Sequence, residues 1–269
     1  MRNNEFAPVT IKCKVLRACL KSAILYGQET WSSSSLCKIE TLFRKAIKLT
    51  FNINTRSPNE IIYMETGFYE LKAEIYKAQH KFWTKIKTDI EKDPDTTVST
   101  LFRKALDKNV QYLRHYKMLH LKFRTPEQCF SHYRESFETE MKNKITTKST
   151  SMDSIYHEYI SLNPNIVTPD FYETYKSSEP NRMIVTKYRT GSHFLHIHRG
   201  RATGTDRNER YCRCLLVQTL SHVLFDCAYT KSIQNANYPT INNLKDFFEQ
   251  DLQLIAGVLL KVEKNLRLR

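Results

Sequence analysis

The feature that most constrains this 269-residue chain is a cysteine and histidine cluster at positions 211–227, where the sequence reads YCRCLLVQTLSHVLFDC. Its spacing is Cys-x-Cys-x7-His-x4-Cys, and its members are Cys212, Cys214, His222 and Cys227. Three thiolates and one imidazole make the four-coordinate set that a structural zinc ion takes. The pattern therefore predicts a zinc site. The alternative is ordinary thiols beside a helix-capping histidine, because most zinc-binding cysteine pairs are separated by two to four residues.

The second half of this cluster predicts a short helix over residues 219–225, with Leu220, Val223 and Leu224 facing inward. His222 would project from that helix. Cys227 follows His222 by five positions, which is about 140° around an ideal helix. We therefore expect Cys227 at or beyond the helix end, where it can face the same ion.

Two stretches around the cysteines carry a wider pattern. Residues 187–195 read KYRTGSHFL, and residues 219–224 read TLSHVL. With the cluster, they resemble the C-terminal region of LINE-type (non-LTR) retrotransposon reverse transcriptases, where an Arg-Thr-Gly-His-like segment precedes a Cys-Cys-His-Cys knuckle. The chain departs from that pattern at Leu215, where the family usually has glycine, and at Gln218, where it usually has glutamate. Ser192 interrupts the Arg-Thr-Gly-His segment.

A second stretch near the N-terminus carries the same resemblance. Residues 25–31 read LYGQETW, which is similar to the Leu-Tyr-Gly-x-Glu-x-Trp signature of the thumb region in these reverse transcriptases. The next predicted helix, with Arg44 and Lys45, fits that region too. Tyr26 and Trp31 are expected to pack at a corner between two helices, because aromatic residues at such junctions mostly supply buried area. The alternative is that they stack on a base or a sugar.

Apolar residues elsewhere recur at helical spacing, and the chain has only 6 glycines, which disfavours hairpin-rich folds. We expect an all-α fold with multi-helical thumb-like and linker bundles and a small zinc knuckle near the C-terminus. The expected regions are 1–92 (thumb-like), 93–180 (helical linker), 181–230 (basic segment plus knuckle) and 231–269 (C-terminal helix).

Local signals set the expected helix ends. The expected signals are Gly27 as a stop, Ser35 as an N-cap, a capping box of Ser57 and Glu60, Gly67 as a stop and Pro126 as a start. Residues 146–151 are expected to form a loop, and Pro164, Pro169 and Pro180 to lie in a looser connector.

The charge balance indicates a polyanionic partner. The chain has 42 basic and 28 acidic residues, a net charge of +14. An acidic membrane surface is the competing partner, but no apolar run approaches the ~20 residues of a membrane span. Seven cysteines without a visible secretory segment indicate a reducing compartment, and we expect the nucleus or the cytoplasm.

The most basic stretch covers residues 182–213. Arginine forms bidentate bonds to phosphate oxygens, and the expected phosphate contacts are Arg189, His193, Arg199, Arg201, Arg44 and Lys45. His196 and His198 could instead form a metal pair, although phosphate contact suits this surface better. For the basic helices of the linker, we expect a solvated face, and a phosphate-contacting face is the alternative.

The chain lacks the residues that polymerisation requires. A reverse transcriptase holds paired metal ions with carboxylates, but no two adjacent aspartates occur here. The resemblance, over residues 11–90 and 182–262, therefore implies the thumb, linker and knuckle without the palm, and no catalysis by this chain alone. It implies a truncated copy or gene-model fragment that binds RNA or DNA, with the missing palm and fingers as further partners. The alternatives are a helical protein–protein interaction fragment whose zinc is purely structural, and an inert remnant.

Overall fold

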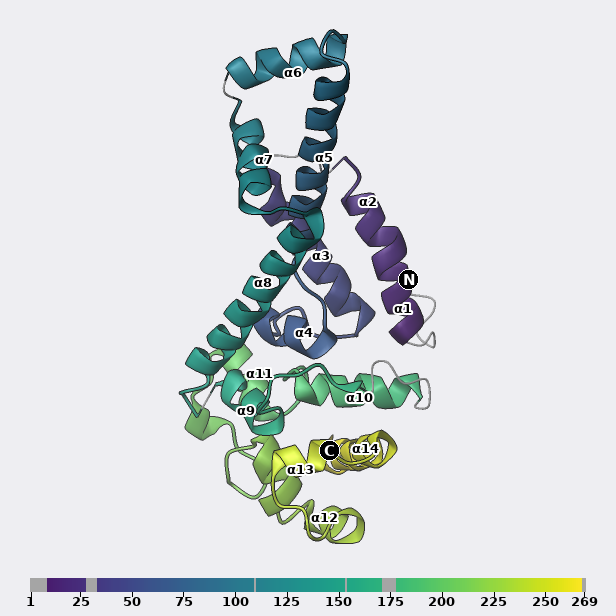
Figure 1. The fold of residues 1–269 in the computed structure, drawn as a ribbon. Helices are drawn as coiled ribbons and strands as arrows, with labels where there is room; N and C mark the ends of the chain where they lie inside the picture. The colour runs from purple at the N-terminus through teal and green to yellow at the C-terminus, as the bar shows by residue number, and fades with distance from the viewer. Residues whose placement is uncertain (1–8, 28–32, 109, 153, 171–177, 268–269) are drawn as a thin grey trace. The chain divides into compact units, whose positions relative to one another are not determined.

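The computed structural model describes residues 9–27, 33–108, 110–152, 154–170 and 178–267 (Figure 1). These residues form an all-α fold, as the sequence predicts, and their only β feature is an isolated bridge between Tyr211 and Val217. Among them, no helix is both long and apolar enough to cross a bilayer. The chain divides into two compact units, each assembled from separated stretches, whereas the sequence predicts four consecutive regions.

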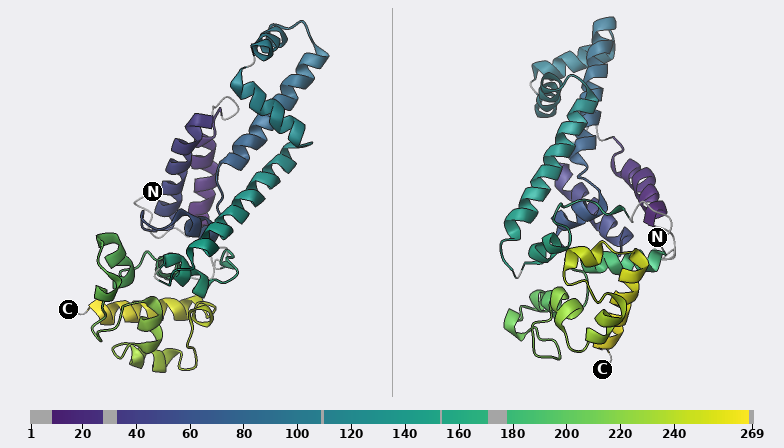
Figure 2. Two further views of the ribbon diagram at one scale, coloured as in Figure 1. Left: turned by 90° about the vertical axis from the view of Figure 1, so that its left-hand side faces the viewer. Right: turned by 60° about the horizontal axis from the view of Figure 1, so that its bottom comes forward.

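One unit comprises residues 17–44 and 69–140. Its helices are most of the π-helix η1 (Leu16–Lys21), α2 (Ser22–Ile24), the first part of α3 (Ser33–Thr50), α5 (Lys72–Lys92), α6 (Thr97–Asp107), α7 (Gln111–Lys122) and most of α8 (Pro126–Lys148). The helices α5 and α7 lie side by side (Figures 1 and 2). Trp83, Leu113 and Tyr116 form a buried core between them.

The other unit comprises residues 1–16, 45–68 and 141–269. Besides the ends of α3 and α8, its elements are α1 (Val9–Val15), α4 (Asn59–Thr66), α9 (Ile155–Leu162), α10 (Glu179–Arg189), α11 (His196–Thr203), η4 (Arg207–Glu209), η5 (His222–Asp226), α12 (Lys231–Asn237), α13 (Leu244–Phe248) and α14 (Leu252–Arg267). The most extensive packing joins α10 and α14, where Val185 and Tyr188 are buried with Leu259 and Val262. The predicted knuckle belongs to the same unit as this core.

A buried ion pair joins three helices of this second unit. Glu65 of α4 is completely buried, and its carboxylate accepts hydrogen bonds from Nε and Nη2 of Arg189 at 2.5 and 3.1 Å. Tyr159 of α9 donates its hydroxyl to the same carboxylate at 3.2 Å. Arg189 was predicted to contact phosphate. That prediction is corrected, because the Arg189 guanidinium is buried and paired with the Glu65 carboxylate.

Several helix ends differ from the predictions. Ser35 lies inside α3, which begins at Ser33. The capping box does not form, because Pro58 occupies the N-cap of α4 without a side-chain cap and the Ser57 hydroxyl pairs with Ser192 Oγ at 2.7 Å. Gly67 ends α4 at φ +67°, as predicted.

Three further expectations about loops and corners need correction. The helix α8 continues to Lys148 through the first part of the expected loop. Pro180 lies in the first turn of α10, where proline needs no hydrogen-bond partner. Tyr26 is 86% exposed, so it does not pack at a helix corner. Trp31 lies outside the described residues.

Candidate metal centre

The first two cysteines lie in a tight turn that the backbone closes on itself. The bridge between Tyr211 and Val217 brings the two sides together. Cys212 N donates to Leu216 O at 2.7 Å, and Leu215 N donates to Cys212 O at 2.9 Å. Leu215 adopts φ +68°, a left-handed conformation that residues with a side chain seldom take. This is the position where the resemblance expects glycine, so the turn after Cys214 forms with a leucine in a strained conformation.

The second half of the cluster lies on a short helix that is buried on its inner side. Leu220, Val223 and Leu224 are at most 1% exposed, as predicted. Residues His222–Asp226 form a π-turn, in which Cys227 N donates to His222 O at 2.8 Å. Cys227 has extended dihedral angles and ends the helix. The expectation that Cys227 lies at the helix end is confirmed.

The four predicted ligands converge on one point. The Sγ atoms of Cys212 and Cys227 are 3.5 Å apart, and those of Cys214 and Cys227 are 4.0 Å apart. Cys214 Sγ lies 3.0 Å from His222 Nε2. Tetrahedral coordination with ordinary zinc bond lengths separates two sulfurs by about 3.8 Å and a sulfur from a nitrogen by about 3.6 Å. All four ligand atoms lie within 4.8 Å of one another, so the set has the dimensions of a metal site.

Burial shifts the pKa values of two members of this cluster, Cys212 and His222, when no cation is bound. Burial, with the neighbouring Cys227 thiol, raises the pKa of Cys212 to about 11. Burial also lowers the pKa of His222 below its ordinary value, so the imidazole stays neutral, as a ligand must be. A divalent cation would supply the positive charge that lets buried thiols bind as thiolates. The donor set therefore fits a thiophilic ion such as zinc.

Hydrogen bonds around the cluster fix the backbone that carries the ligands. Thr230 is 1% exposed and donates its hydroxyl to Val223 O at 2.6 Å. Tyr238, at the end of α12, donates its hydroxyl to Leu224 O at 2.8 Å. Such outer contacts orient metal ligands. They connect the π-turn to the core of its unit.

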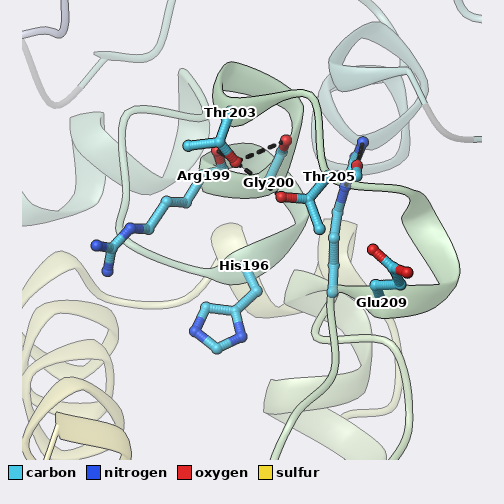
Figure 3. A pocket seen from close by; sticks show the side chains of 7 residues that line it. His196, Arg199, Gly200, Thr203, Thr205 and Glu209 are labelled. Atoms are coloured by element: carbon cyan, nitrogen blue, oxygen red, sulfur yellow. Dashed lines mark hydrogen bonds between the residues drawn. The ribbon is translucent and has the colours of Figure 1, made fainter.

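Two of the predicted phosphate contacts are accessible on α11. Arg199 and Arg201 are exposed. Arg199 also lines a pocket of about 200 Å³ with His196, Gly200, Thr203, Thr205, Glu209 and Arg210 (Figure 3). Figure 3 shows the Arg199 guanidinium pointing away from Glu209. Arg210, in contrast to Arg199, donates hydrogen bonds within the protein, to the backbone carbonyls of Thr205 and Ile197 at 2.7–3.0 Å. It therefore holds the loop that follows α11 in place.

The remaining predicted contacts differ in accessibility. On α3, Lys45 is exposed and Arg44 is half-buried, with Nη2 donating to Thr41 Oγ1 at 2.9 Å. His193 is buried, and its ring stacks on Tyr188 with 4.8 Å between centroids. Burial, with His198 nearby, lowers the pKa of His193 to about 4. The prediction that His193 contacts phosphate is corrected, because the ring faces the interior.

The alternative of a metal pair formed by His196 and His198 on α11 is not what the structure shows. His196 is exposed, and its Nδ1 lies 2.7 Å from Tyr211 O. His198 Nε2 lies 3.0 Å from Glu158 Oε1 of α9. Glu158 is not among the predicted site residues, because it is 40 residues from His198 and no local spacing connects the two.

No protein-family model, curated protein or solved structure gives a significant match to this chain.

Proposed function

We propose that this chain binds nucleic acid through an arginine-rich surface that a zinc knuckle holds in place, as the non-catalytic C-terminal part of a LINE-type reverse transcriptase. The observation that carries the proposal is the convergence of Cys212, Cys214, His222 and Cys227 within 4.8 Å. The backbone strain of Leu215 at φ +68° must be offset by stabilising interactions elsewhere in the structure. A bound ion would supply such interactions.

The charges around the knuckle support phosphate as the ligand. Arg213 lies between the two cysteines of the turn and is exposed, and Arg199 and Arg201 are exposed on α11. The pocket beside Arg199 is lined by residues of α11 and η4, and η4 directly precedes the knuckle in the sequence. Zinc would fix the backbone, and the arginines would then contact phosphate oxygens with less loss of conformational freedom. The resemblance assigns α3, with Arg44 and Lys45, to the thumb that holds template and primer.

The test is fluorescence anisotropy of the full chain with a structured RNA and with a duplex DNA across a salt series, with and without a zinc chelator. We expect affinity to fall with salt, with a logarithmic slope near −0.9 per neutralised phosphate on the duplex. We expect chelation to abolish most of the binding. Binding that is absent at low salt, or independent of salt, would contradict the proposal.

Matched variants locate the contacts. The pair Arg199→Gln and Arg201→Gln should reduce the magnitude of the slope by about 2. The control pair Lys85→Gln and Lys92→Gln removes the same charge from exposed positions on α5 and should leave the slope unchanged. A reduced slope only in the pair Arg44→Gln and Lys45→Gln would move the contact surface to α3.

A second candidate function is protein–protein interaction, and the tip of the knuckle favours it. Leu215 and Leu216 are 78% and 56% exposed, and Tyr211 is 47% exposed. Exposed apolar residues that sit together can mark a binding surface. Such a partner would bind with little dependence on salt, so the same salt series separates the two candidates.

A further inference from the structure

Three side chains from separate elements converge at a second place, within the unit that carries the knuckle. Glu158 comes from α9, His193 from the turn between α10 and α11, and His198 from α11. Glu158 Oε1 lies 3.0 Å from His198 Nε2 and 3.4 Å from His193 Nε2. The three ligand atoms all lie within 4.8 Å of one another.

The separations and the donor types suit a first-row metal ion. Zinc bonds of about 2.0–2.1 Å to nitrogen and oxygen, at tetrahedral angles, separate an imidazole nitrogen from a carboxylate oxygen by about 3.4 Å. Both imidazoles direct Nε2 at the same carboxylate oxygen. Two imidazoles and one glutamate are also a ligand set that zinc takes when its fourth position is left to water.

The surroundings hold these side chains in place and keep bulk water away. The side chains of His193, His198 and Glu158 are 0%, 7% and 14% exposed. The His193 ring is fixed by stacking on Tyr188, with an angle of 27° between the rings. Its Nδ1 is buried and makes no hydrogen bond within the described part of the chain, so the stacking and the contact of Nε2 with Glu158 set the ring's orientation.

A glycine lets the backbone pass close to this triad. Gly191 has φ +62°, and a Cβ there would lie 2.2 Å from Ile155 Cδ1 and 3.3 Å from His198 Nε2. A larger residue would displace Ile155 or push His198 out of line. The close passage brings α9 and the start of α11 together at the point where the ligand atoms meet.

We propose that Glu158, His193 and His198 form a second metal site, which takes a borderline divalent ion such as Zn²⁺ with water as a fourth ligand. The ion connects α9 to α11 and the turn before it. Its nitrogen and oxygen donors distinguish it from the sulfur-rich knuckle. The competing explanation is a metal-free hydrogen-bonded triad. The 3.0 Å separation between His198 and Glu158 fits an ordinary hydrogen bond, whereas the 3.4 Å separation between His193 and Glu158 is longer than one and matches two ligands of a shared ion.

Cobalt loading of the full chain tests the site. The protein is stripped of metal, loaded with Co²⁺, freed of excess ion and analysed for cobalt per chain. Cysteine ligands give sulfur-to-cobalt charge-transfer bands, whereas a site of nitrogen and oxygen ligands does not. We expect two ions per wild-type chain, and one per chain in His198→Gln with the charge-transfer bands retained. His196→Gln is the matched control, because this exposed histidine lies on the same helix outside the triad, and it should keep two ions.

Two further variants guard against misfolding and separate this site from the knuckle. Glu158→Gln keeps the side-chain shape and should also bind one ion, with unchanged circular dichroism. The double variant Cys212→Ser and Cys214→Ser should retain one ion without charge-transfer bands, whatever its effect on nucleic-acid binding. The proposal is overturned if His198→Gln and Glu158→Gln both keep two ions. It is equally overturned if the wild-type chain binds a single ion with charge-transfer bands.

Discussion

At the scale of single residues, Leu215 occupies a position in the cysteine turn whose backbone conformation favours glycine. Its φ of +68° costs a residue with a side chain about 1–2 kcal/mol, whereas glycine adopts it readily. The side chain is 78% exposed, so little packing opposes the change. The turn is therefore maintained by its hydrogen bonds and, in the proposed function, by zinc.

The prediction is that Leu215→Gly stabilises the chain by about 1 kcal/mol, because relieved strain exceeds the added freedom of the unfolded chain. Urea unfolding of zinc-loaded protein measures this change in free energy. Leu216→Gly is the control, because Leu216 is also exposed but has no positive φ. This control should be destabilised. If both variants lost stability equally, Leu215 would not be strained in solution.

A second prediction concerns Arg189. Arg189→Met leaves the Glu65 carboxylate buried without its cation, so we expect a loss of about 3–5 kcal/mol in the free energy of unfolding. The double variant Glu65→Gln and Arg189→Met should recover part of that loss, as a double-mutant cycle would measure. The salt slope of nucleic-acid binding by folded Arg189→Met should equal that of the parent. A reduced slope would return Arg189 to the phosphate-contacting set.

At the scale of elements, helix periodicity and local stop signals carried most of the information. The end of α4 at Gly67 and the start of α8 at Pro126 follow from the chemistry of those residues. The capping box fails for a reason outside the local sequence. The Ser57 hydroxyl is taken by Ser192, which is 135 residues away. Local patterns cannot reveal such a competitor.

Glu74 of α5 provides a prediction about the pH dependence of stability. Burial alone would raise the pKa of Glu74, but hydrogen bonds from Lys21 and Tyr69 outweigh it and hold the pKa below 4.5. Glu74 therefore contributes stability that is complete above about pH 4.5 and is lost as the pH falls through its lowered folded-state pKa. We expect Glu74→Gln to weaken the acid dependence of urea unfolding, followed by tryptophan fluorescence. Glu91→Gln, at an exposed ion pair on the same helix, should leave it unchanged.

At the scale of the whole molecule, sequence separation explains which parts of the sites could be predicted. The four cysteine and histidine residues of the cluster lie within 16 consecutive positions, so their spacing alone indicated the cluster that the structure brings together. The partners of His193 and Arg189 lie 35 and 124 residues away. The basic composition of residues 182–213 could not distinguish these buried side chains from the exposed Arg199, because burial depends on the tertiary fold.

The division into two units yields the last prediction, which concerns metal removal. Metal binding is coupled to folding where the ligands stabilise a turn. Chelation, or Cys227→Ser, should therefore unfold the knuckle and the adjoining η5 and α12. The core of the other unit around Trp83 and Tyr116 contains none of these ligands and should remain intact. Hydrogen exchange followed by mass spectrometry should show lost protection over residues 210–238 and unchanged protection over residues 72–122. Equal loss in both segments would mean that the units fold as one, and unchanged exchange throughout would mean that the cysteine cluster holds no structural ion.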